Sequence, residues 1–127
     1  MKRMLLLLAA ASLLTCLGCR TENSRPADTL RNLRASLDLV KKAPADKPFT
    51  APCPAVSALP GLSREQIKAA LGTPHLCGPD WAPFAHEGDW FYSFYKLPNT
   101  MVGGGPELVL QFGRGDICTS ATWVNTQ

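Results

Sequence analysis

The chain has 127 residues, of which 46% are hydrophobic, with 13 Lys and Arg against 10 Asp and Glu. This length allows one small domain and excludes a large multidomain enzyme. Part of the small positive charge comes from Lys2 and Arg3, so the rest of the chain is close to neutral. It lacks the basic stripe, interleaved with aromatic residues, that binding to nucleic acid requires.

The first residues have the pattern of a secretion signal. Lys2 and Arg3 precede an apolar run over residues 4–17. This run is too short to span a bilayer comfortably, and no later segment is apolar for long enough to do so. We therefore expect residues 1–18 to be a signal peptide.

The end of this signal resembles a bacterial lipobox, in which small residues precede a Cys that is acylated before cleavage. Gly18 and Cys19 stand at these positions. The resemblance implies a lipoprotein anchored through Cys19, with palmitate among its acyl chains, since several chains give stable membrane attachment. Arg20 in the next position favours the outer membrane, facing the periplasm. An ordinary soluble secretion signal is the alternative.

Residues 19–55 are expected to form a lipid-anchored tether ahead of a domain over residues 56–127. An apolar stripe in the tether predicts a helix over residues 28–42, capped by Asp28 and stopped by Pro44. The stripe has helical spacing and consists of Leu30, Leu33, Leu37 and Val40. It is interpreted as packing on the chain's own domain or as a marginal tether helix, with docking on a partner or the membrane as the alternative. The Pro-rich residues that follow predict a stiff, extended linker.

The start of the domain carries strong signals for a second helix. Ser63 and Gln66 have the spacing of a capping box, which predicts a helix over residues 64–71. Gly72 is a natural left-handed terminator, and Pro74 prevents the helix from continuing.

The remainder of the domain is expected to form strands. Three strands are expected, at residues 90–95, 108–112 and 117–124. Residues 113–116 between the last two predict a hairpin turn. That position is sufficient to explain Arg114-Gly115-Asp116, which also matches an adhesion tripeptide. The three glycines at 103–105 predict a mobile loop.

Alternation along the strands separates a core face from a candidate partner surface. The face that the helix must cover is expected to hold Trp90, Tyr92, Phe94, Leu108, Leu110 and Phe112. The opposite face is expected to present exposed aromatic and aliphatic side chains to a partner. These partner-surface candidates are Phe91, Tyr95, Val109 and Trp123. The face of Trp123 is left open, because a bulge near Gly115 would move it to the core face.

The segment Gly61-Leu-Ser-Arg-Glu-Gln-Ile-Lys-Ala-Ala-Leu-Gly-Thr-Pro74, followed by the strands Trp90–Phe94 and Leu108–Phe112, resembles the SmpA/OmlA family of BamE-like outer-membrane lipoproteins. The match covers about residues 61 to 124. It implies an α+β fold in which short helices pack on one face of a three-stranded antiparallel sheet. It also implies a non-enzymatic accessory role in the assembly of β-barrel outer-membrane proteins, with envelope proteins as partners.

The cysteines depart from this family. With Cys16 in the leader and Cys19 as anchor, three thiols remain in an oxidising compartment, so one disulfide and one unpaired Cys are expected. In a sheet of three consecutive antiparallel strands, Cys77 and Cys118 come to the same end. Cys77 is therefore the expected member of the disulfide, with Cys118 as its first expected partner and Cys53 as the second.

No arrangement of residues predicts catalysis, a cofactor or a metal. Potential zinc ligands lie in loops without the spacing of a zinc site, namely His75, Cys77, His86, Glu87 and Asp89. No nucleophile stands in a recognisable arrangement with a base. The expected function is therefore protein binding at the envelope. The alternative is an inhibitor-type periplasmic protein that inserts the loop Met101–Pro106 into an enzyme.

Overall fold

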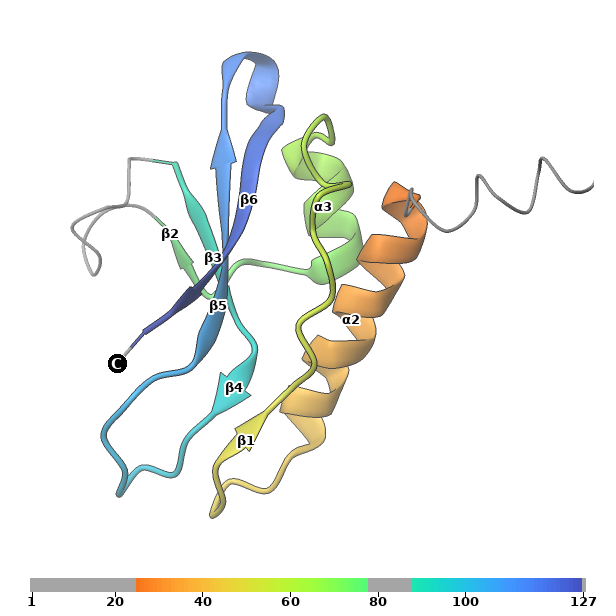
Figure 1. Ribbon diagram of the computed structural model, residues 1–127. Coiled ribbons are helices and arrows are strands. Elements are labelled where there is room, and N and C mark those ends of the chain that lie inside the picture. Colours follow the sequence, from red (N-terminus) through yellow and green to blue (C-terminus); the bar gives the residue numbers. More distant parts are fainter. Residues whose placement is uncertain (1–24, 78–87, 127) are drawn as a thin grey trace, which may run out of the picture.

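The computed structural model describes residues 25–77 and 88–126 (Figure 1). These residues form a mixed α+β structure with two helices and small antiparallel sheets. Both helices lie on the same side of the larger sheet (Figure 1). No helix among the described residues is long and apolar enough to cross a bilayer. The expected signal peptide and Cys19 lie outside the described residues.

The first described helix, α2, spans Pro26–Lys42 and begins two residues earlier than expected. Pro26 occupies its first turn, where a missing N–H costs nothing because no intrahelical acceptor is available. Asp28 therefore does not cap the helix; it pairs with Arg31 at 3.2 Å inside the first turn. The helix ends just before Pro44, with the Ala43 N–H bonded to the Leu39 and Val40 carbonyls.

The apolar stripe of α2 packs into the core of the molecule. Leu33, Leu37 and Val40 are buried in one cluster with residues of the sheet, such as Leu108 and Leu110. Burial of these side chains stabilises the fold through the hydrophobic effect. The stripe therefore packs on the chain's own domain, and α2 is not a detached tether helix.

The Pro-rich segment is also part of the folded unit. Its strand β1 (Phe49–Thr50) pairs antiparallel with β4 (Tyr95–Lys96). Ala51, Val56 and Leu59 are buried in the same cluster as α2. The boundary expected between residues 55 and 56 thus does not separate a tether from a domain, because apolar side chains on both sides of it share one core.

Helix α3, Arg64–Leu71, has the predicted limits. The Ser63 hydroxyl accepts from the Gln66 N–H at 3.1 Å, and the Gln66 side chain accepts from the Ser63 N–H at 2.9 Å. This reciprocal pair is the predicted capping box. Gly72 ends the helix with φ at 84°, and its carbonyl accepts from the Tyr92 hydroxyl at 2.8 Å.

The larger sheet is antiparallel, with the strand order β2-β3-β5-β6. Its strands are β2 (Leu76–Cys77), β3 (Trp90–Ser93), β5 (Pro106–Phe112) and β6 (Cys118–Asn125). The three predicted strands are thus present with shifted ends. The short edge strand β2 was not predicted, because two residues are too few to show alternation.

The aromatic segment divides at Phe94 between the two sheets. The Phe94 N–H donates to the Pro106 carbonyl at 3.0 Å, while the Phe94 carbonyl accepts from the Ala51 N–H at 2.9 Å. The residues before Phe94 therefore pair with β5, and the residues after it pair with β1. This change of partner shortens the strand that was expected over residues 90–95.

The predicted core face is confirmed. All six of its residues belong to the cluster that the helices cover, together with Ala121 and Trp123 of β6. A second, smaller cluster lies on the opposite face and contains Phe91, Val109 and Val124.

Candidate functional site

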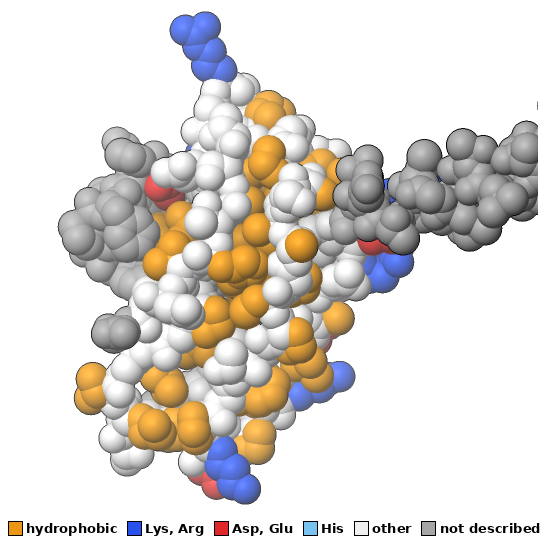
Figure 2. All heavy atoms as spheres, in the orientation of Figure 1, with side chains coloured by type: hydrophobic (Ala, Val, Ile, Leu, Met, Phe, Trp, Pro, Cys, Tyr) orange, Lys and Arg blue, Asp and Glu red, His pale blue; other side chains and the backbone are white. Residues whose placement is uncertain are grey.

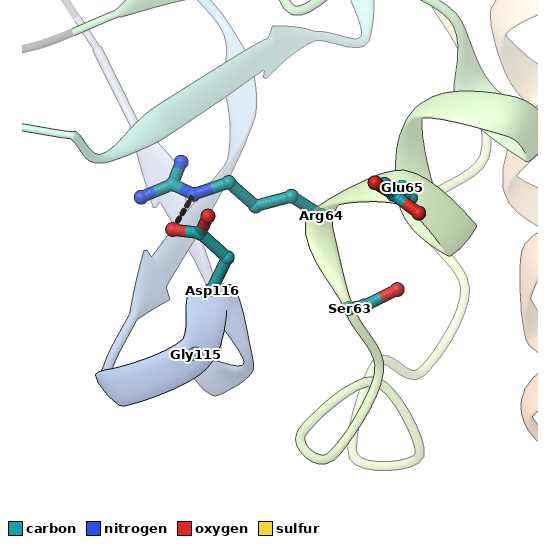
Figure 3. Close-up of a pocket in the computed structure, with 5 residues that line it drawn as sticks. All are labelled: Ser63, Arg64, Glu65, Gly115 and Asp116. Carbon is teal, nitrogen blue, oxygen red and sulfur yellow. Dashed lines mark hydrogen bonds and ion pairs between the residues drawn. The ribbon is translucent and has the colours of Figure 1, made fainter.

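Arg64 joins the start of α3 to the turn between β5 and β6. Its Nε donates to Asp116 Oδ1 at 2.9 Å, and its Nη1 donates to the Gly88 carbonyl at 2.8 Å. Figure 3 shows the Arg64 side chain extending from the helix toward Asp116. Two segments that are far apart in sequence are therefore held by one guanidinium group.

The same guanidinium also lies over aromatic rings. It is 3.9 Å from the ring centroid of Phe112 and 5.1 Å from that of Trp90. These two rings contact each other edge to face, with centroids 4.9 Å apart. Cation–π attraction therefore adds to the hydrogen bonds of Arg64. A Cβ at Gly88 would come to 3.0 Å from Arg64 Nη2.

A small pocket of about 240 Å³ opens beside this contact (Figure 3). It is lined by Ser63, Arg64, Glu65, Gly115 and Asp116. The Ser63 hydroxyl caps α3, and Arg64 pairs with Asp116. Ser63, Arg64 and Asp116 thus already serve the fold, and no hydrogen bond among the described residues pairs the Ser63 hydroxyl with a base that would activate it as a nucleophile.

The Arg114-Gly115-Asp116 tripeptide forms the connection between β5 and β6, as the turn interpretation predicts. The turn is kinked at Gly115, and both Gly115 and Asp116 have left-handed backbone angles, with φ of 70° and 56°. The Asp116 carboxylate accepts from Arg64, which ties the turn to the body of the molecule.

The four expected partner-surface residues do not form one exposed surface. Phe91 is fully buried and Val109 almost so, on the face opposite the helices. Trp123 lies on the helix-covered face, where its Nε1 donates to the Pro54 carbonyl at 2.9 Å. Tyr95 is half-buried in β4, in the other sheet. The prediction of this surface was therefore wrong, because it assumed that one sheet face stays open.

The expected Cys77–Cys118 disulfide is excluded by the strand order. Cys77 lies in the edge strand β2 and Cys118 in the opposite edge strand β6. Three strand spacings of about 4.8 Å separate these strands by roughly 14 Å, whereas bridged Cα atoms lie within about 7 Å. The expectation failed because β2 adds to the outside of β3, away from β6.

The two cysteines with described side chains are free thiols. Cys118 is buried and Cys53 is exposed. Burial raises the pKa of the Cys118 thiol, although a hydrogen bond involving the Ser120 backbone opposes this effect. Burial also raises the pKa of Cys53. Because Cys53 is a free thiol, the alternative pairing of Cys77 with Cys53 is not formed either.

His75, one of the residues considered for a metal site, has a structural contact instead. Its Nδ1 accepts from the Ser93 N–H at 2.7 Å, and its ring meets Tyr92 edge to face. Burial and the nearby Lys41 lower the pKa of His75. His86 and Glu87 lie outside the described residues, and no group of three metal-ligating side chains occurs within residues 25–77 and 88–126.

Glu107 is a buried carboxyl group that the sequence analysis did not single out. It is 2% exposed, and its Oε1 accepts from the Ser93 hydroxyl at 2.7 Å. Its Oε2 is buried without a hydrogen-bond partner. Burial raises the pKa of Glu107, while hydrogen bonds with Ser93 and Thr126 oppose the rise. In the sequence, only its place between Pro106 and Leu108, next to the strand predicted at residues 108–112, could have pointed to the burial of this carboxyl group.

Large apolar side chains are exposed at four described positions, which are Leu39, Met101, Val102 and Ile117. Met101 and Val102 are adjacent, and they lie in the loop between β4 and β5. Val102 is fully exposed. This loop therefore presents the one pair of neighbouring exposed large hydrophobic side chains within the described part of the chain.

Comparisons with protein-family models, curated proteins and solved structures gave no match for this chain.

Proposed function

We propose that this chain is a lipid-anchored, non-enzymatic protein-binding module of the bacterial outer membrane. It faces the periplasm and acts as an accessory subunit of a larger envelope assembly, the one that inserts β-barrel proteins. Its anchor is the acylated Cys19, and its function uses neither a cofactor nor nucleic acid.

The observation that carries this proposal is the coincidence of two sequence patterns with the order of elements. The lipobox-like Gly18-Cys19 precedes the SmpA/OmlA-like segment Gly61–Pro74. This segment forms a capped helix followed by antiparallel strands, and both helices cover one face of the sheet (Figure 1). Helices on one face of an antiparallel sheet are what the family resemblance implies, although the larger sheet has a fourth strand, β2, beyond the three that the family implies.

The anchor is tested by labelling cells with an alkyne analogue of palmitate and following the label on this chain. We expect Cys19→Ala to abolish labelling and to release the protein from the outer-membrane fraction. Cys16→Ala is the matched control, since it alters a neighbouring thiol in the same leader and should leave labelling intact. Equal labelling of both variants would refute the assigned anchor.

The partner is tested by mild cross-linking in intact envelopes, followed by mass spectrometry of what co-purifies with the anchored chain. Recovery of barrel-assembly subunits supports the accessory role. We expect the double substitution Met101→Ser and Val102→Ser to reduce this recovery, because it removes the exposed apolar pair. Leu39→Ser removes an isolated exposed side chain on α2 and is the control.

The exposed Met101–Val102 pair also favours a second candidate function, an inhibitor-type protein. In that case the loop inserts into the active site of a periplasmic enzyme. The same cross-linking experiment separates the two, since it would recover one enzyme and none of the assembly subunits. The loop substitutions would then restore the activity of that enzyme.

A further inference from the structure

The outer edge of β6 carries backbone groups without partners among the described residues. The Thr126 N–H donates to the Gly105 carbonyl at 3.0 Å, which fixes Gly105 and Thr126 as a hydrogen-bonded pair. Such pairs alternate along antiparallel strands. The N–H and C=O groups of Ala121, Trp123 and Asn125 therefore point away from β5, toward the open edge.

At the end of this edge where β6 begins, the chain itself occupies the backbone groups. The Cys118 N–H donates to the Leu62 carbonyl at 2.7 Å, and the Cys118 carbonyl accepts from the Gly61 N–H at 2.8 Å. No hydrogen bond within the described residues engages the outward backbone groups of Ala121, Trp123 or Asn125. The open part of the edge is thus confined to the second half of β6.

This edge lacks the features that normally prevent strand pairing. Edge strands are usually short, or they carry Lys, Pro or a bulge. The opposite edge strand, β2, has only two residues. In contrast, β6 has eight residues with no charge and no Pro. Its pairing with β5 shifts register near its first residues, opposite Gln111 and Phe112, and is regular beyond that point.

The surroundings of the edge are also uncharged. Neither the segment 49–62 nor the segment 117–126 contains a charged residue. Figure 2 shows this side of the molecule, where hydrophobic side chains gather at the centre of the view and charged side chains lie toward the margin. An approaching strand would therefore meet no charge repulsion here.

We propose that the open edge of β6 pairs antiparallel with the β6 edge of a second copy of this chain. The two sheets then continue into one, with Trp123 opposite Trp123 of the other copy. In this register Ala121 lies opposite Asn125, so all three outward residues exchange backbone hydrogen bonds with one another. This inference goes beyond the proposed function and does not depend on it.

The closed end of the edge selects this register. A shift that places Ala121 opposite Ala121 would bring Asn125 of the second copy opposite Ile117, against the chain at Gly61 and Leu62. The register centred on Trp123 keeps the second strand within the open half. Because the pairing is symmetric about Trp123, both copies use the same residues, as a two-fold interface requires. No residue in the paired segment is charged.

Register-specific disulfide trapping tests this interface in the full-length chain. The proposed register places Thr122 opposite Val124 of the other copy in a non-hydrogen-bonded pair, where Cα atoms lie about 4.5 Å apart, within disulfide range. Two differently tagged chains are co-expressed, one with Thr122→Cys and one with Val124→Cys. Both carry Cys53→Ser, which removes the exposed native thiol.

We expect mild oxidation to link the two tagged chains at least tenfold more than the mismatched control, Thr119→Cys with Val124→Cys. Adding Asn125→Pro, which removes one outward N–H at the end of the strand, should reduce the link. Equal linking of matched and mismatched pairs would overturn the proposal. Linking of β6 only to a different protein would also overturn it, since the occupant is then not a second copy. Circular dichroism of the purified variants shows that each of them is folded.

Discussion

Arg64 and Asp116 are 52 residues apart, yet Arg64 Nε lies 2.9 Å from Asp116 Oδ1. The Arg64 side chain is 23% exposed, whereas that of Asp116 is 72% exposed. An ion pair with one partner this open to water contributes little by itself. The stacking over Phe112 and the bond to the Gly88 carbonyl therefore account for most of what Arg64 contributes.

Arg64→Gln is expected to lower the free energy of unfolding by about 1–3 kcal/mol, because it removes the cation–π contact and the charged hydrogen bonds together. Asp116→Asn should lower it by no more than about 1 kcal/mol. Urea denaturation followed by tryptophan fluorescence measures both. Arg114→Gln is the control, since Arg114 is exposed in the same turn. Equal effects of the Arg64 and Arg114 variants would contradict the assigned role.

Leu37→Ala tests whether α2 belongs to the folded unit. Leu37 is buried in the common core, so its truncation should cost about 2–5 kcal/mol through lost burial and a cavity. Leu39→Ala is matched in chemistry and helix position but exposed, and it should change stability by less than about 0.5 kcal/mol. Thermal unfolding of the two variants compares them. If Leu37→Ala left the thermal stability unchanged, α2 would be a tether helix outside the folded core.

Glu107→Gln tests the consequence of burying a carboxyl group. Because burial raises the pKa of Glu107 in the folded state, the native protein binds its proton more tightly than the unfolded chain does. Stability from this group is therefore present below the ordinary Glu pKa and is lost as pH rises through the elevated value. Glu107→Gln should remove this loss and stabilise the protein at neutral pH.

The measurement for Glu107 is the free energy of unfolding as a function of pH from 4 to 8, for the wild type and the variant. Glu65→Gln is the control, since Glu65 is exposed at the start of α3. A wild-type curve parallel to that of Glu107→Gln would show that the carboxyl group is not perturbed by burial.

The cysteines give a prediction that needs no substitution. Cys53 is exposed and should react with a maleimide in the native protein, whereas buried Cys118 should react only after unfolding. Burial raises the pKa of both thiols, so the expected difference rests on their exposure. Peptide mapping under non-reducing conditions should find Cys118 unlinked. A peptide joining Cys77 to Cys118 would contradict the strand order β2-β3-β5-β6.

Local signals in the sequence were sufficient to predict those features of the fold that depend on residues close together in the chain. The capping box at Ser63 and Gln66 and the terminator Gly72 determined α3 to the residue. Alternation in β3 and β5 correctly identified the face that the helices cover. Both kinds of signal act over a few residues of backbone, so no knowledge of distant contacts was needed.

The tertiary structure alone decided which elements meet. It placed α2 and the Pro-rich segment in the common core, moved Cys77 to the edge away from Cys118, and buried Phe91 and Val109. The same apolar stripe or alternating strand serves equally well as a core face or a docking face. Burial depends on which distant segments cover it, and this is settled by packing of the whole chain rather than by local pattern.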